Sequence, residues 1–80
     1  MKITTLITEL NAANVKQMTK GLQTKYAALS KPQAKDIATG LIEYKGKVKG
    51  CHPAATLQGV VDKVQDSCNN AGLNVVISMA

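Results

Sequence analysis

Five apolar side chains between residues 53 and 69 fall on one face of a helix, and this pattern constrains the fold more than any other in the chain. The intervals of three and four residues between them match a helical stripe. We therefore predict one unbroken amphipathic helix over residues 53–69, with Gly72 just beyond its end. The stripe consists of Leu57, Val60, Val61, Val64 and Cys68.

This helix also determines how the two cysteines are related. Cys51 precedes the helix and Cys68 lies near its end, so a rise of 1.5 Å per residue separates them by about 25 Å. A disulfide requires Cα atoms within about 7 Å of each other. We expect two reduced thiols within one chain, with Cys68 in the core.

Two earlier segments show the same helical spacing, and we predict helices over residues 12–29 and 31–45. Asn11 is the expected N-cap of the first. Ser30 and Gln33 have the spacing of a capping box at the start of the second.

Glycines lie both at the end of one predicted helix and inside all three. Gly46 and Gly50 are expected to end the second of these helices. Gly21, Gly40 and Gly59 recur every 19 residues, each inside a predicted helix. Because a glycine inside a helix costs about 1 kcal/mol relative to alanine, these positions indicate either close helix approach or a chance similarity.

The two ends of the chain predict a short sheet. Residues 73–79 alternate as a strand does, and residues 2–8 are rich in β-branched side chains. Residues 2–10 also match helical spacing, so both alternatives stay open; we favour the strand, because it would pair with residues 73–79. The side chains on one face of the C-terminal strand are Leu73, Val75, Ile77 and Met79.

The predicted fold is therefore mostly α (α+β): three helices and a short C-terminal strand, paired with residues 2–8 or with a second chain. A chain of 80 residues forms one small domain, residues 1–80. It has no Phe or Trp, so its core must be aliphatic. A two-stranded sheet is marginal and leaves an open edge, so we expect a homodimer or higher homo-oligomer with the four strand residues above as its interface.

The chain is strongly basic: it has ten lysines and five acidic residues, which gives a net charge of +5, and it has no arginine. Lysine attracts anions at long range but lacks the planar fork with which arginine reads bases. This composition disfavours sequence-specific DNA recognition and allows attraction to nucleic acid or to an acidic protein. Lysines in the first two predicted helices would form one basic face only if the fold brings those helices together.

The stretch YKGKVKGCHP, residues 44–53, is the candidate anion site. Its glycines would let backbone N–H groups converge, and the following helix N-terminus favours negative charge. The spacing is not that of a P-loop, and the alternative is a solvated connector. The candidate residues for binding an anion or nucleic acid are Lys45, Lys47, Lys49, Gly50 and His52.

Catalytic and metal sites find little support in the sequence. Cys51 and His52 are adjacent, which is a poor arrangement for an acid–base pair, and no third orienting residue is identifiable. With Cys68 they supply three zinc ligands where a structural site uses four. We expect no enzyme, no metal and no cofactor. The N-terminus lacks the apolar run of a signal peptide or membrane span, so we expect a cytoplasmic protein without membrane contact.

These observations favour a small, self-associating interaction or regulatory protein that binds and occludes another macromolecule, most simply a protein. The alternative is non-specific binding of nucleic acid or a phosphate ligand through the lysine-rich loop and the following helix N-terminus.

Overall fold

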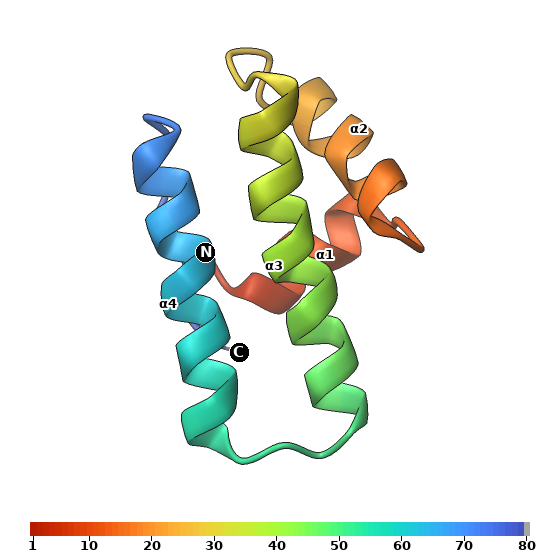
Figure 1. Ribbon diagram of the computed structural model, residues 1–80, viewed down its shortest axis with the longest axis vertical. Coiled ribbons are helices and arrows are strands. Elements are labelled where there is room, and N and C mark those ends of the chain that lie inside the picture. Colours follow the sequence, from red (N-terminus) through yellow and green to blue (C-terminus); the bar gives the residue numbers. More distant parts are fainter. Residues whose placement is uncertain (80) are drawn as a thin grey trace.

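The computed structural model describes residues 1–79 of the chain, and within them the protein folds into four helices. Helix α3 stands between α4 and α2 and packs against both, while the short α1 crosses behind α3 (Figure 1). The prediction of a mostly helical fold is confirmed. The helices are α1 (Ile3–Leu10), α2 (Val15–Lys25), α3 (Lys31–Lys49) and α4 (Ala54–Asn70).

The predicted helix over 12–29 is shorter at both ends, and the predicted cap Asn11 is wrong. Asn11 lies at the end of α1 in the left-handed conformation (φ 44°), which asparagine tolerates better than most residues. The N-cap of α2 is Asn14, whose side chain accepts a hydrogen bond from the Gln17 N–H at 2.9 Å. The Gln17 side chain in turn accepts a hydrogen bond from the Ala13 N–H at 2.9 Å. The start of α2 is therefore held by two reciprocal hydrogen bonds, much as in a capping box.

Helix α3 begins as predicted and ends later than predicted. Ser30 and Gln33 form the expected capping box. Gly46 does not end the helix, which continues to Lys49 with Gly50 as its C-cap.

Helix α4 confirms the prediction over 53–69 to within one residue at each end. Its stripe is buried at Val60, Val61, Val64 and Cys68. Gly72 follows with φ 75°, and its N–H donates to the Asn69 carbonyl at 3.0 Å. Both cysteines are free: Cys51 is exposed, and Cys68 is buried at the far end of the helix.

The predicted sheet is wrong: residues 1–79 contain no strand beyond one isolated parallel bridge between Lys2 and Ser78. Most of the segment 2–8 belongs to α1, so the helical spacing prevailed over the β-branched composition. The Ser78 N–H donates to the Met1 carbonyl at 2.9 Å, and the Ile3 N–H donates to the Ser78 carbonyl at 2.9 Å. The two chain ends therefore meet, over too few residues for a sheet.

The extended C-terminal segment finds a further partner in the side chain of Gln65 on α4. The Gln65 Nε2 donates to the Val75 carbonyl at 2.8 Å, and its Oε1 accepts from the Ile77 N–H at 2.6 Å. One carboxamide thus satisfies two backbone groups that a neighbouring strand would otherwise satisfy.

Close helix contact explains two of the three recurring glycines. A Cβ on Gly40 would lie 2.6 Å from the Val64 Cγ2, so α3 and α4 approach closely there. A Cβ on Gly21 would lie 3.1 Å from the Leu10 Cδ2. Gly59 has open space around it, so its place in the series has no packing reason.

Candidate functional site

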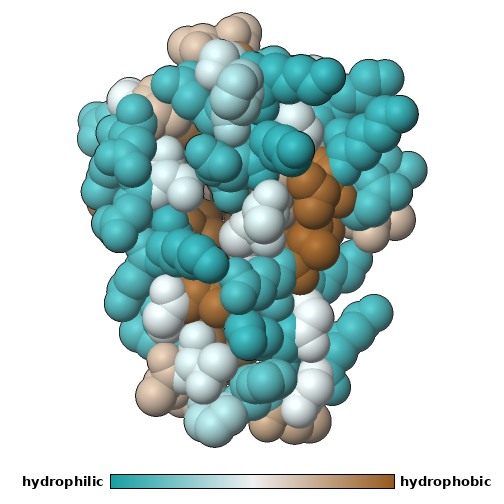
Figure 2. Space-filling model, in the orientation of Figure 1, coloured by the Kyte–Doolittle hydropathy of each residue, from teal (hydrophilic) through white to brown (hydrophobic). Residues whose placement is uncertain are grey.

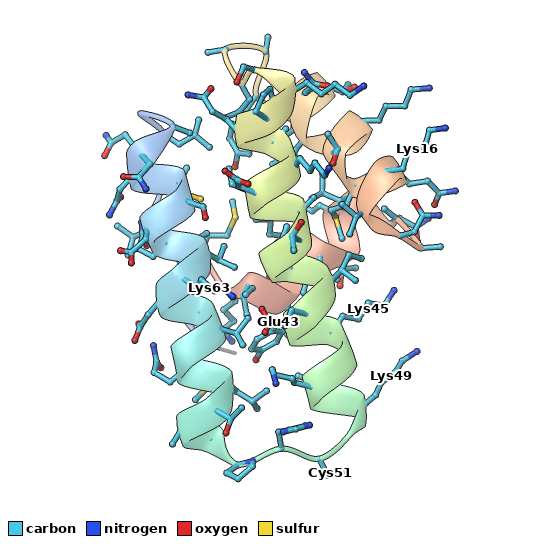
Figure 3. The ribbon with its side chains drawn as sticks, in the orientation of Figure 1. Lys16, Glu43, Lys45, Lys49, Cys51 and Lys63 are labelled. Atoms are coloured by element: carbon cyan, nitrogen blue, oxygen red, sulfur yellow. The ribbon has the colours of Figure 1, made fainter. Side chains whose placement is uncertain are left out.

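Lysines from two helices converge on one side of the molecule. Lys16 and Lys20 on α2 line the same hollow as Lys31 and Lys35 on α3. Further along α3, Lys45 and Lys49 point to the same side as Lys16 (Figure 3). We call the four lysines of the hollow and these two the lysine face: Lys16, Lys20, Lys31, Lys35, Lys45 and Lys49.

The four lysines of the face that belong to α3 follow a line along that helix. At about 100° per residue, all four fall within an arc of about 80°. Lys31 and Lys49 lie about 27 Å apart along the helix axis. All are exposed except the partly buried Lys45, whose Nζ donates to the Ala12 carbonyl at 3.5 Å.

Acidic side chains neutralise lysines elsewhere but not on this face. Within residues 1–79 the ion pairs are Lys25 with Glu9, at 2.8 Å, and Lys63 with Glu43, at 3.4 Å. Glu9 also raises the pKa of Lys25, through their hydrogen bond first and their charges second. Glu43 and Lys63 lie between α3 and α4, away from the lysine face (Figure 3). The positive charges of the face are therefore uncompensated in the described chain.

A hollow of about 540 Å³ lies between α2 and the start of α3. Hydrophobic surface shows between these two helices in the space-filling view (Figure 2). The volume of the hollow is within the range of pockets that hold small molecules or side chains of a partner. The lining consists of Val15, Lys16, Thr19, Lys20, Gln23, Lys31 and Lys35.

The predicted anion loop has a different geometry from the one expected. Lys45, Lys47 and Lys49 all belong to the last turns of α3, and Lys47 lies nearly opposite Lys49 around the helix axis. This end of a helix carries partial negative charge, which favours lysine and disfavours an anion. The loop lysines are therefore split between two sides of α3.

The backbone N–H groups between α3 and α4 are also already hydrogen-bonded within the chain. The N–H groups of Gly50, Cys51 and His52 donate to the carbonyls of Gly46, Val48 and Lys47, respectively, at 3.1 to 3.2 Å. These bonds terminate α3, so the three amides do not converge on a site for a phosphate. The structure gives no backbone support to the predicted role of Gly50 and His52.

The residues predicted as a strand interface lie mostly against the core. Ile77 is 6% exposed, and Leu73, Val75 and Met79 are partly buried and pack against the buried cluster. The residues between them, Asn74, Val76 and Ser78, are exposed, with Val76 at 74%. The alternation expected from the sequence is present, but its apolar side covers this chain's own core.

The candidate metal ligands named in the sequence do not come together in the part of the chain that the structure describes. Across residues 1–79, no group of three or more His, Cys, Asp or Glu side chains converges as metal ligands would. Burial raises the pKa of the Cys68 thiol, which disfavours the reactive thiolate.

Sequence analysis raised a basic face of these helices only as a condition, and it did not predict the hollow. The usable signal is a pair of lysines one turn apart in each of two consecutive helices: Lys16 with Lys20, and Lys31 with Lys35. A short connection between such helices makes them antiparallel neighbours, which can place the two pairs face to face.

No helix within the described residues has the length and apolar character needed to cross a membrane. Comparison with protein-family models, curated proteins and solved structures finds no match to this chain.

Proposed function

We propose that the protein is a small non-enzymatic interaction protein that binds, and thereby occludes, an acidic region of another protein through its lysine face. The observation that carries this proposal is the segregation of charge. Lysines from α2 and α3 gather on one side, while both ion pairs lie elsewhere in residues 1–79. A field of one sign attracts a partner of the opposite sign and speeds its association.

A protein partner fits this face better than a nucleic acid does. Nucleic-acid grooves combine basic residues with aromatic side chains that stack on bases. Here Tyr44 is buried in the core, and Tyr26 lies beneath the Lys25 ammonium at 5.8 Å from the ring centroid. The lysine face instead borders a hollow that exposes apolar surface, which suits an apolar side chain of a protein.

The proposal is tested with a fluorescently labelled, glutamate-rich peptide in an anisotropy titration at several salt concentrations. We expect binding at low salt that weakens as salt rises, because exposed charges are screened beyond about 10 Å at 0.1 M. The double variant Lys16→Gln/Lys35→Gln should weaken it. The matched control is Lys2→Gln/Lys47→Gln, which removes the same charge away from the face and should have little effect. Equal losses in the two variants would mean that net charge, and not this face, attracts the peptide.

Non-specific nucleic-acid binding is the second candidate, and the line of lysines along α3 favours it. A row of about 27 Å is long enough to contact several phosphates of one strand. Titration with a 20-base-pair duplex under the same conditions distinguishes the two functions. Duplex binding tighter than peptide binding, again lost in the Lys16→Gln/Lys35→Gln variant, would favour nucleic acid.

Self-association stays a prediction, and this proposal does not depend on it. The strand edge on which it rested does not form, and the large apolar side chains that are clearly exposed within residues 1–79 are Met1, Val48 and Val76. Size-exclusion chromatography with light scattering measures it directly: a dimer at high concentration would support self-association, and a monomer would rule it out.

A further inference from the structure

We infer that the hollow between α2 and α3 binds an amphipathic helix of the partner. The apolar stripe of that helix would enter the hollow, and its carboxylates would lie on both sides of the stripe. This inference rests on the proposed function and specifies the partner segment that the lysine face recognises.

The walls of the hollow carry its charge. Lys16 and Lys20 rise from α2 on one side, and Lys31 and Lys35 rise from α3 on the other. Each pair is separated by one helical turn, about 6 Å. A helix lying between them presents carboxylates at the same spacing of one turn, so glutamates on either side of its apolar stripe meet one wall each. The same pattern flanks the apolar seam of coiled coils.

Thr19, the most buried polar residue lining the hollow, needs no hydrogen-bond partner from another molecule. Thr19 is 7% exposed, and its hydroxyl donates to the Val15 carbonyl at 2.7 Å. Val15 adds apolar surface beside it. An apolar side chain entering the hollow therefore displaces water without breaking a hydrogen bond of Thr19, whereas a charged group would lose hydration there.

The dimensions limit the occupant to a short segment. From Val15 to Gln23 the lining of α2 extends about 12 Å, which corresponds to about two turns of a partner helix. A contact of this size between surface charges and a few apolar groups is weak and reversible, so we expect micromolar affinity or weaker.

No described part of this chain occupies the hollow. The C-terminal segment, the longest stretch outside the helices, is held by Gln65 of α4 and by residues 1–3. Neutralising the walls therefore requires another molecule. Lysines on both sides of Val15 and Thr19 suit an acidic amphipathic helix better than an evenly charged chain.

The test uses two labelled 18-residue peptides of identical composition, built from Glu, Leu and Ala. In the first, Leu recurs every three or four residues with Glu on both sides of the stripe; in the second the same residues are scrambled. We expect the striped peptide to bind about tenfold more tightly at low salt, since only it combines apolar burial with both walls.

Two variants that remove equal charge from the lysine face locate the contact. Lys16→Gln/Lys35→Gln takes one lysine from each wall, and Lys45→Gln/Lys49→Gln takes two from the same face outside the hollow. The first should weaken the striped peptide about tenfold and the second less than threefold, with unchanged circular dichroism in both. Amide shifts in NMR spectra on adding the striped peptide should be largest around Thr19 and Gln23.

Other outcomes separate this inference from the proposed function. If both peptides bind equally well and both variants weaken them alike, the face binds acidic chains and the inference about the hollow is wrong. If neither peptide binds at low salt, the proposed function fails together with the inference. If a 20-base-pair duplex binds more tightly than the striped peptide and competes with it, nucleic acid is the occupant and both are overturned.

Discussion

Cys51 occupies a backbone position that usually belongs to glycine. After the C-cap of α3 it adopts the left-handed conformation, with φ 55°. Its N–H donates to the Val48 carbonyl, and the next N–H, of His52, donates to the Lys47 carbonyl, which is the Schellman pattern. Helix α4 ends in the same way with Gly72 in this position, at φ 75°. The two ends form a matched pair, and only the one with Cys51 is strained, because glycine has no Cβ.

Replacing Cys51 by glycine should therefore stabilise the fold. Removing the Cβ relieves a strain of about 1 kcal/mol, partly offset by the greater freedom of glycine in the unfolded chain, so we expect a gain of about 0.5 kcal/mol. Gly72→Ala should lose about 1 kcal/mol, because it introduces the strain at the equivalent position of α4. Urea denaturation measures both. A loss of stability in Cys51→Gly would show that the thiol contributes more than its backbone strain costs.

Gly40 should tolerate no larger residue, although alanine is the better helix former. The Cβ of Gly40→Ala would lie 2.6 Å from the Val64 Cγ2, so α3 and α4 would have to separate. We expect a loss of about 1–3 kcal/mol, larger than the gain of up to about 1 kcal/mol in helix propensity.

Gly59→Ala provides the control for Gly40→Ala, because the same substitution there enters open space inside α4. It should raise the free energy of unfolding by about 0.5–1 kcal/mol. Thermal denaturation of the two variants compares them directly. If both are stabilised, the close contact between α3 and α4 is not required for packing.

At the level of elements, signals local to α3 and α4 predicted the starts of these two helices, whereas pairing was not predicted. The capping box of Ser30 with Gln33 and the apolar stripe of α4 each lie within one helix, and both were confirmed. Residues 2–8 satisfied two patterns at once, so only tertiary contact could decide between them. The partner of the C-terminal segment was unpredictable in principle, because it is the side chain of Gln65 and not a strand.

Gln65 should therefore matter far more than an ordinary glutamine on a helix surface. Gln65→Ala leaves the Val75 carbonyl and the Ile77 N–H without their partner, both in part-buried bonds, so we expect a loss of about 2 kcal/mol. Hydrogen exchange at the Ile77 amide should also accelerate.

The matched control for Gln65→Ala is Gln58→Ala on the same helix. Gln58 is exposed and its hydrogen bond goes to the Asp62 side chain, so we expect a change within about 0.5 kcal/mol. Equal losses in the two variants would mean that helix propensity, and not attachment of the C-terminal segment, explains the effect of Gln65→Ala.

At the level of the whole molecule, the sequence predicted an excess of positive charge but not where it gathers. Lys16 and Lys35 are 19 residues apart, and they line one hollow only because α2 and α3 pack side by side. The sequence pointed instead to residues 44–53, where three lysines are close along the chain. Helix geometry then separates them, because Lys47 lies nearly opposite Lys49 around the axis.

This gathering of like charge should reduce the stability of the free protein. Lys16 with Lys20 and Lys31 with Lys35 are like-charge pairs at a spacing of four residues, and all four line the hollow. Such pairs cost about 0.2–0.5 kcal/mol each, and salt screens them.

We expect the midpoint of urea denaturation to rise between 10 mM and 500 mM sodium chloride. The Lys16→Gln/Lys35→Gln variant should be more stable than the parent at 10 mM by several tenths of a kcal/mol and about equal to it at 500 mM. Lys63→Gln should show no such gain, because Lys63 is paired with Glu43 at 3.4 Å. A parent protein whose stability falls as salt is added would show that attractive ion pairs outweigh repulsion on the lysine face, and would remove the reason why a partner must neutralise it.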